Sequence, residues 1–223
     1  MTDKKETISI LGGTGDLGTG LAIRWAKAGH EIVIGSRTQE KAEKAVADLQ
    51  AISPSTKARA MSNPDAAAAG DVVVLTVPAE HQLSTLASVK EHLEGKILID
   101  VTVPLVPPKV GTVQLPPEGS AGKRAQDLLG DNVQVVTAFQ NIAAHLLQQD
   151  VAIECDVLVA GNKKAARQTV IDLAAEAGMR GWHAGPIENS AAAEALTSIL
   201  IQINRSGILS HSGIKIIGQE DGH

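Results

Sequence analysis

A glycine-rich turn near the N-terminus has the residue types and the spacing of a phosphate-binding site. The apolar run Ile8–Leu11 leads into Gly13, Gly15 and Gly18, which fit the pattern G-x-G-x-x-G. In such a turn the first glycine allows a tight bend and the second lets the backbone approach a pyrophosphate. The third lets the following helix pack on the strand. Because N–H groups at a helix start attract anions, the pattern between a strand and a helix predicts dinucleotide binding.

The end of the next expected strand carries side chains that would select between the two nicotinamide dinucleotides. Enzymes that use NAD place an Asp or Glu about 20 residues after the glycines, where its carboxylate bonds the adenine ribose. This chain instead has Gly35, Ser36 and Arg37, with Lys41 one helical turn further on. A hydroxyl, a guanidinium and an ammonium would bind the 2′-phosphate of NADP, whereas a carboxylate would repel it. We therefore predict a strong preference for NADP(H).

These groups need a scaffold of alternating strands and helices. Short β-branched runs alternate with Ala-rich stretches, and several runs are apolar throughout, as in strands that helices cover on both faces. The predicted strands are 8–11, 31–34, 58–61, 71–77, 96–101, 133–136 and 156–159. The predicted helices are 17–28, 40–49, a short one opened by Asn63-Pro64, 80–93, 163–177 capped by Asn162, and one capped by Ser190 that ends near Gly207. The alternation predicts an α/β fold of the Rossmann type, a doubly wound and mostly parallel sheet with a small C-terminal helical appendage.

The length of the chain indicates one large unit with a small addition. A chain of 223 residues exceeds one Rossmann unit and falls short of two full domains. We expect an NADP-binding Rossmann-like domain over residues 1–185 and a C-terminal helical segment over residues 186–223 that closes the substrate crevice. The proline-rich stretch 103–119 should be an exposed, irregular connection.

The composition argues against several other classes of protein. A net charge of −5 and only two Trp and one Phe disfavour binding of nucleic acid. No run approaches the roughly 18 apolar residues of a membrane span, and the charged N-terminus leads us to expect no signal peptide. The single cysteine, Cys155, allows no intrachain disulfide and no cysteine-rich metal site, and we expect it in the core. The expected location is the cytoplasm.

Four motifs together resemble the F420-dependent NADP oxidoreductase family. They occur in the family's order and span nearly the whole chain. They are residues 10–18 with 35–37 and 41–43, Val74–His81, Val135–Ala144 and Ser212–Lys215. The resemblance implies an oxidoreductase, an NADPH:F420 oxidoreductase, that transfers a hydride directly between NADP(H) and the deazaflavin coenzyme F420.

The resemblance also implies which residues form the two halves of the site. The NADP-binding residues would be Gly13, Thr14, Gly15, Asp16, Leu17, Gly18, Ser36, Arg37, Lys41, Val77, Pro78, Ala79, Leu83, Leu105 and Ala144. The deazaflavin would contact His81, Asn141, Ile142 and Ala143. Hydride transfer needs two rings face to face, so we expect positioning to suffice, with no catalytic side chain and no metal. Ala143 and Ala144 could instead only pack in a strand-to-helix turn. Asp100 ends a predicted strand and could suggest a general base, but we expect it to be a structural cap.

Two other functions fit the same residues, and one surface suggests a partner. The alternatives are an NADPH-dependent flavin or ferric reductase and a module that senses NADP without catalysis.

On the last helix, Leu196, Ile199, Leu200 and Ile203 form one apolar stripe. This stripe would pack on its own sheet or on a second copy, and we expect a homodimer.

Overall fold

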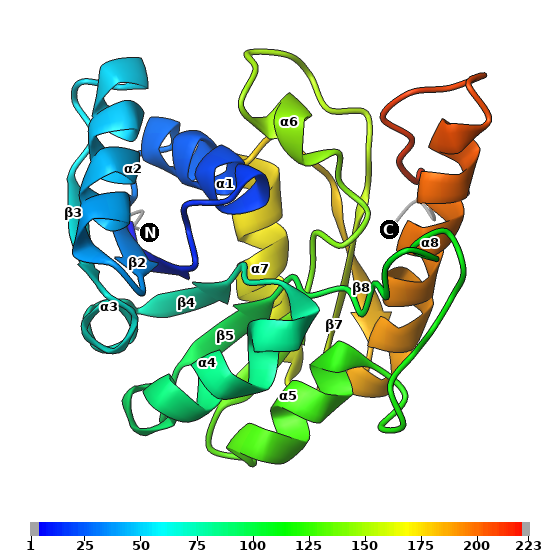
Figure 1. Cartoon of the computed structure of the whole chain (residues 1–223), viewed down its shortest axis with the longest axis horizontal. Helices are drawn as coiled ribbons and strands as arrows, with labels where there is room; N and C mark the ends of the chain where they lie inside the picture. The colour runs from blue at the N-terminus through cyan, green and yellow to red at the C-terminus, as the bar shows by residue number, and fades with distance from the viewer. Residues whose placement is uncertain (1–4, 220–223) are drawn as a thin grey trace.

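Eight strands form one sheet in the computed structural model, which describes residues 5–219 (Figure 1). The strands are β1 (Thr7–Leu11), β2 (Glu31–Ser36), β3 (Ala58–Ser62), β4 (Val72–Leu75), β5 (Ile97–Asp100), β6 (Gln134–Thr137), β7 (Val157–Gly161) and β8 (Gly181–Gly185). Their order across the sheet is β3-β2-β1-β4-β5-β6-β7-β8. Every neighbouring pair is parallel except β6 and β7, which are antiparallel. The predicted doubly wound, mostly parallel sheet is confirmed.

Helices cover both faces of this sheet. They are α1 (Asp16–Lys27), α2 (Gln39–Ile52), α3 (Asn63–Ala69), α4 (Gln82–Val89), α5 (Ala121–Leu129), α6 (Ala144–Leu147), α7 (Lys164–Glu176) and α8 (Ser190–Arg205). Three 3-10 turns accompany them, η1 (Ala79–His81), η2 (Lys90–His92) and η3 (Ile187–Asn189). Helices α1, α2 and α7 lie on one face, and α3, α4 and α5 lie on the other (Figure 1).

Burial of both faces explains why the strands are apolar along their length. Ile8 and Ile10 of β1 join Trp25 of α1 in the core on the first face. Leu11 points to the opposite face, where it joins Ala66 of α3 in a second core. Side chains of a strand alternate between the two faces, so both sets must be apolar when helices cover each one.

Three elements were not predicted from the sequence, and one predicted helix is divided. Strand β8 has the sequence GWHAG, which shows no apolar alternation because this edge strand is only partly buried. Helices α5 and α6 were also missed, and α6 has only four residues. The predicted helix 80–93 is divided into η1, α4 and η2. The proline-rich stretch 103–119 contains no helix or strand, as predicted.

The three predicted helix caps were wrong, because the residue before each helix start differs from the expected one: the N-caps are Ser62, Lys163 and Asn189. The cap of α3 is Ser62, whose hydroxyl accepts the N–H of Asp65, while Asn63 is already helical. Asn162 accepts the N–H of Ile187 at 3.1 Å and leaves Lys163 as the N-cap of α7. Ser190 is the first residue of α8, and its hydroxyl donates to the hydroxyl of Ser120 at 2.7 Å. Such tertiary hydrogen bonds compete with local capping.

The segment after α8 runs back along the start of β7. The carbonyl of Ile214 accepts the N–H of Asp156 at 2.8 Å, and the N–H of Ile216 donates to the Asp156 carboxylate at 2.7 Å. A Cβ on Gly213 would lie 2.6 Å from Cys155 Sγ. Cys155 is therefore buried, as expected, and burial raises the pKa of its thiol. The domain boundary at residue 185 stays a prediction.

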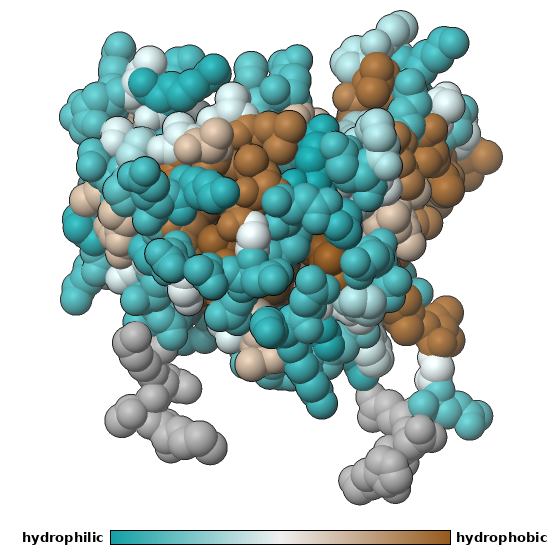
Figure 2. All heavy atoms as spheres, turned by 90° about the horizontal axis from the view of Figure 1, so that it is seen from below, coloured by the Kyte–Doolittle hydropathy of each residue, from teal (hydrophilic) through white to brown (hydrophobic). Residues whose placement is uncertain are grey.

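Apolar side chains are exposed around α8 and the segment that follows it. Figure 2 shows them gathered on the side of the molecule where α8 lies in Figure 1. The predicted stripe is divided, because Leu200 is buried whereas Ile199 and Ile203 are exposed. Ile208 and Leu209 extend this exposed surface beyond the helix. Within residues 5–219, no helix has the length and the apolar character that crossing a bilayer requires.

Candidate functional site

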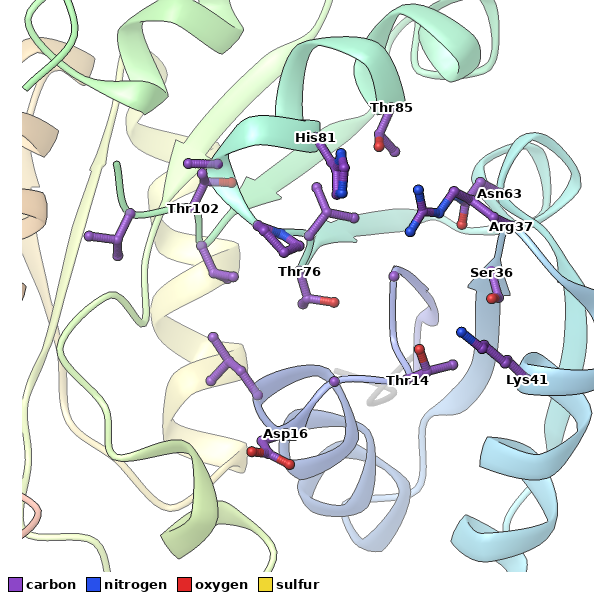
Figure 3. Close-up of a pocket in the computed structure, with 18 of the residues that line it drawn as sticks. Thr14, Asp16, Ser36, Arg37, Lys41, Asn63, Thr76, His81, Thr85 and Thr102 are labelled. Carbon is purple, nitrogen blue, oxygen red and sulfur yellow. The ribbon is translucent and has the colours of Figure 1, made fainter. Parts of the chain in front are cut away.

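A cavity of about 590 Å³ opens at the carboxyl ends of β1, β2, β4 and β5 (Figure 3). The strand order changes direction between β1 and β4, and open α/β sheets bind their ligands at such a point. The lining residues are Gly12, Thr14, Gly15, Asp16, Leu17, Ser36, Arg37, Thr38, Lys41, Asn63, Thr76, Val77, Pro78, Ala79, His81, Thr85, Val101, Thr102, Val103 and Leu105.

The turn after β1 presents the start of α1 to the cavity. A Cβ on Gly15 would meet no atom within 4 Å, because this glycine faces open space. A Cβ on Gly18 would lie 2.8 Å from the Cα of Gly13, so Gly18 permits the predicted close packing of α1. No side chain caps α1, whose N-cap is Gly15, and its first N–H groups are available to an anion.

The motif predicted that Gly13 makes the tight bend of this turn. In the structure the bend is made by Gly12. Gly12 has φ +71°, a conformation that favours glycine, and its N–H donates to the carbonyl of Gly35 at 3.0 Å. Gly13 is needed for a different reason, because a Cβ there would lie 2.9 Å from the carbonyl oxygen of Ile10. The two glycines together fold the chain back across the end of β1.

Two cations and a hydroxyl stand at one end of the cavity, where the 2′-phosphate was predicted to bind. Ser36 ends β2, Arg37 follows it, and Lys41 lies in the first turn of α2 (Figure 3). Within residues 5–219 neither Arg37 nor Lys41 has a hydrogen bond or an ion pair. The lining residues include one carboxylate, that of Asp16, which lies away from both cations in Figure 3. This end of the cavity is suited to an anion.

One buried oxygen atom in the cavity wall has no hydrogen-bond partner in the described chain. It is Asn63 Oδ1, on the first residue of α3 and beside Arg37 in Figure 3. The Thr102 hydroxyl, after β5, interacts with the buried Asp100 carboxyl and lowers the pKa of that group. A buried polar atom without a partner costs about 1–3 kcal/mol, and a ligand donor that reached Asn63 Oδ1 would relieve this cost.

The other end of the cavity is mostly apolar. Its walls are the segment Thr76–Ala79 after β4 and the segment Val101–Leu105 after β5. His81 lines the same region from η1, and its imidazole is partly exposed. Apolar walls with a few polar atoms are typical of sites that hold a planar ring and exclude water.

Asp100 lies behind this wall and is a structural cap, as expected. It is fully buried and accepts the N–H of Thr102 at 2.9 Å and a hydrogen bond from the Gln82 amide. Burial raises the pKa of its carboxyl, and the hydrogen bonds oppose that rise. Gln82 is fixed in turn by the guanidinium of Arg124, which donates to Gln82 Oε1 at 2.6 and 2.9 Å.

A second buried carboxyl connects α8 to α5. Glu194 accepts the N–H groups of Ala121 and Gly122 at 2.7 and 3.0 Å, and so caps the start of α5 from a distance in sequence. Burial raises the pKa of Glu194 to about 7, because the loss of water outweighs the two backbone hydrogen bonds.

The structure brings together most, but not all, of the residues that the sequence suggested. The cavity is lined by Thr14, Gly15, Asp16, Leu17, Ser36, Arg37, Lys41, Val77, Pro78, Ala79, His81 and Leu105. Seven others do not line it, namely Gly13, Gly18, Leu83, Asn141, Ile142, Ala143 and Ala144. Leu83 is exposed on α4, and Asn141 is buried with its amide donating to Ala193 O at 2.8 Å.

Sequence reasoning missed eight lining residues: Gly12, Thr38, Asn63, Thr76, Thr85, Val101, Thr102 and Val103. Thr76 and Val101 directly follow β4 and β5, so the rule that ligands bind at carboxyl ends of strands could have found them. Asn63 directly follows β3, so the same rule could have found it, and the packing of α3 beside β2 holds it at the cavity.

Comparison with known proteins identifies the family. A family model described as "NADP oxidoreductase coenzyme F420-dependent" matches residues 7–104, which include every lining residue except Leu105. An F420-dependent NADP reductase of Methanocaldococcus jannaschii is 41% identical over 222 residues, which cover 96% of this chain and 99% of the relative. The chain belongs to this family.

Further members show the same extent of similarity. The F420-dependent NADP reductase of Methanothermobacter thermautotrophicus is 41% identical over 218 residues, 94% of each chain. A crystal structure from Arthrobacter sp. FB24, provisionally assigned as an F420-dependent NADP-reductase, superposes with a TM-score of 0.81 and 27% identity. It covers 96% of this chain and 100% of the other. The family likeness therefore extends beyond the cavity to the C-terminal helices.

Proposed function

We propose that this chain is an NADPH:F420 oxidoreductase, which transfers a hydride between NADP(H) and the deazaflavin coenzyme F420. The observation that carries the proposal is the 41% identity to F420-dependent NADP reductases over nearly the full length of both chains. The cavity supports it, because one end suits a phosphate and the other suits a planar ring. NADP(H) and F420 are the two substrates.

The nucleotide lies along the cavity with its ends in different surroundings. The pyrophosphate binds at the start of α1, where Gly15 leaves open space. The 2′-phosphate binds Ser36, Arg37 and Lys41, and Asn63 Oδ1 is available to the adenosine half. The nicotinamide then lies at the apolar end, between the segments Thr76–Ala79 and Val101–Leu105.

The chain contributes positioning and exclusion of water to the reaction. Bound NADPH supplies the hydride, and the deazaflavin ring of F420 supplies the accepting carbon. The side chains of Val77, Pro78 and Leu105 keep water from the apolar end of the cavity. The reduced deazaflavin also takes up one proton, which solvent supplies. Asp100 is not needed as its carrier, since it is buried behind the wall and bonded to Gln82 and Thr102. The rate depends on how closely the two rings are held.

Oxidation of NADPH with alternative acceptors tests the proposed function. We expect purified protein to consume NADPH with F420 and to be at least tenfold slower with FMN, FAD or ferric citrate. The reverse reaction, from reduced F420 to NADP+, should follow the same preference. Turnover with a flavin or iron but not with F420 would identify a flavin or ferric reductase instead. Tight binding of NADPH without oxidation by any acceptor would identify a sensing module.

We infer that the chain forms a homodimer through the exposed apolar surface of α8 and the segment after it. Ile199, Ile203, Ile208 and Leu209 belong to this surface, and large exposed apolar patches commonly mark protein interfaces. Light scattering should give twice the monomer mass of 23.1 kDa. The double variant Ile203→Asp, Leu209→Asp should give the monomer, and a monomeric wild-type chain would refute the inference. The cytoplasmic location stays a prediction.

A further inference from the structure

Helix α1 carries an arginine that holds the segment after β6 in place. Arg24 lies in the last turn of α1, far from its phosphate-binding end. Its Nε donates to the carbonyl of Leu147 at 3.0 Å. Its Nη2 lies 3.2, 2.7 and 2.9 Å from the carbonyls of Leu146, Gln149 and Val151. One guanidinium therefore binds four backbone carbonyls that are more than 120 residues away in sequence.

Those carbonyls belong to the end of α6 and the turn that follows it. A helix of four residues is too short to be stable alone, and its last carbonyls have no partner within the helix. The N–H of Gln149 donates to the Leu146 carbonyl at 3.2 Å, and Arg24 adds donors to the carbonyls of Leu146 and Leu147. Gly20, one turn before Arg24, brings the two helices into contact, because a Cβ there would lie 2.5 Å from the Cβ of Leu147. The position of α6 is thus set by α1.

The segment that contains α6 bridges two walls of the cavity. At one end, Gln140 donates to the carbonyl of Asp100 at 3.0 Å, directly before the wall segment that begins at Val101. At the other end, Gln148 donates to the carbonyl of Asp16 at 3.1 Å, and Asp16 lines the cavity at the start of α1. Residues 140–148 therefore border the apolar end of the cavity without lining it.

We propose that Arg24 is a positioning residue for hydride transfer, acting through residues 140–148. The proposal rests on the proposed function, in which the nicotinamide occupies the apolar end of the cavity. The acceptor ring must approach that end, and the bridging segment is the adjacent wall. Because Arg24 does not line the cavity, its loss should leave NADPH binding nearly intact while the acceptor wall is displaced. A misplacement of about 1 Å can slow such a reaction about 100-fold.

Single-turnover kinetics of the variants Arg24→Met and Arg24→Lys provide the test. We expect Arg24→Met to lower the first-order rate constant for oxidation of bound NADPH by F420 roughly ten- to 100-fold. The dissociation constant for NADPH should change less than threefold. Arg24→Lys should restore part of the rate, because an ammonium can bind one or two of the carbonyls. A misfolded fraction would lower the amplitude of the reaction and not its rate constant.

Lys96→Met is the matched control. The Lys96 ammonium also donates to two backbone carbonyls, those of Ala67 and Ala68 at 2.7 and 2.8 Å, at the end of α3 and away from the cavity. The rate constant for oxidation of bound NADPH by F420 should be the same in Lys96→Met as in the wild type, even if the melting temperature of the variant is lower. Hydrogen exchange of residues 144–151 should accelerate in Arg24→Met alone, which measures the docking of α6 without any turnover.

The outcomes separate this inference from the proposed function. An unchanged rate constant in Arg24→Met, or a loss of rate matched by an equal loss of NADPH affinity, would overturn the positioning role. A wild-type chain that does not oxidise NADPH with F420 would refute the proposed function and with it the role in hydride transfer. In that event unchanged hydrogen exchange in Arg24→Met would also refute the docking role.

Discussion

Replacing Arg37 by alanine is expected to raise the dissociation constant for NADPH about 10- to 100-fold and to leave that for NADH nearly unchanged. A hydrogen bond between charged groups contributes about 1.5–3 kcal/mol, and each 1.4 kcal/mol corresponds to a factor of about ten in affinity. Arg37 has no other partner in the described chain, so its removal breaks no internal contact. Isothermal titration calorimetry with both nucleotides measures the effect.

Arg59→Ala is the control for this prediction. Arg59 also lies near the edge of the sheet formed by β3, but it pairs with Glu31 at 2.8 Å and does not line the cavity. The affinity of the Arg59→Ala variant for NADPH should match that of the wild type. The combined variant Arg37→Ala, Lys41→Ala should lose most of the preference for NADPH over NADH. Equal weakening of both nucleotides by Arg37→Ala would show that the guanidinium does not bind the 2′-phosphate.

The second large effect concerns the pH dependence of stability, and it arises from Glu194. The folded chain raises the pKa of this carboxyl from 4.5 to about 7, because burial outweighs the hydrogen bonds from Ala121 and Gly122. Between these two values the folded state binds more protons than the unfolded state, so stability falls as the pH rises. The contribution of Glu194 to the free energy of unfolding is fully lost above pH 7, and this loss amounts to about 3 kcal/mol.

Glu194→Gln should remove that loss, since the amide does not titrate. The free energy of unfolding, measured in urea from pH 5 to pH 8, should fall more steeply for the wild type than for the variant. The difference between the two proteins isolates Glu194 from other groups that titrate. Glu188→Gln, which changes an exposed carboxyl just before α8, should leave the wild-type profile unaltered. Parallel profiles for wild type and Glu194→Gln would contradict the raised pKa.

Features that depend on neighbouring residues could be predicted before the fold was known. The glycine-rich turn follows from Gly15 and Gly18, because Gly15 leaves open space at the start of α1 and Gly18 permits close packing of α1 on Gly13. The predicted preference for NADP rests on Arg37 and Lys41, which stand at fixed places after β2. The parallel sheet follows from apolar runs that alternate with helices. In each case the cause lies within a few residues of the effect.

Other features could not be predicted, because their partners lie far along the chain. The N-cap of α5 is the local Ser120, but the N–H groups of Ala121 and Gly122 bind Glu194, some 70 residues away. Nothing in the sequence around Ala121 indicates that second partner. The edge strand β8 likewise depends on its pairing with β7, because its own sequence shows no apolar alternation.

The sequence by itself determined the fold class, the phosphate-binding turn and the cations after β2, because propensity, turn chemistry and spacing act locally. Only the tertiary structure decided that Asn63 Oδ1 is buried without a partner in the described chain and that Asn141 is hydrogen-bonded to α8. The tertiary structure also decided that Arg24 anchors α6. Burial and hydrogen bonding between distant residues exist only when the sheet has assembled, so no local pattern could encode them.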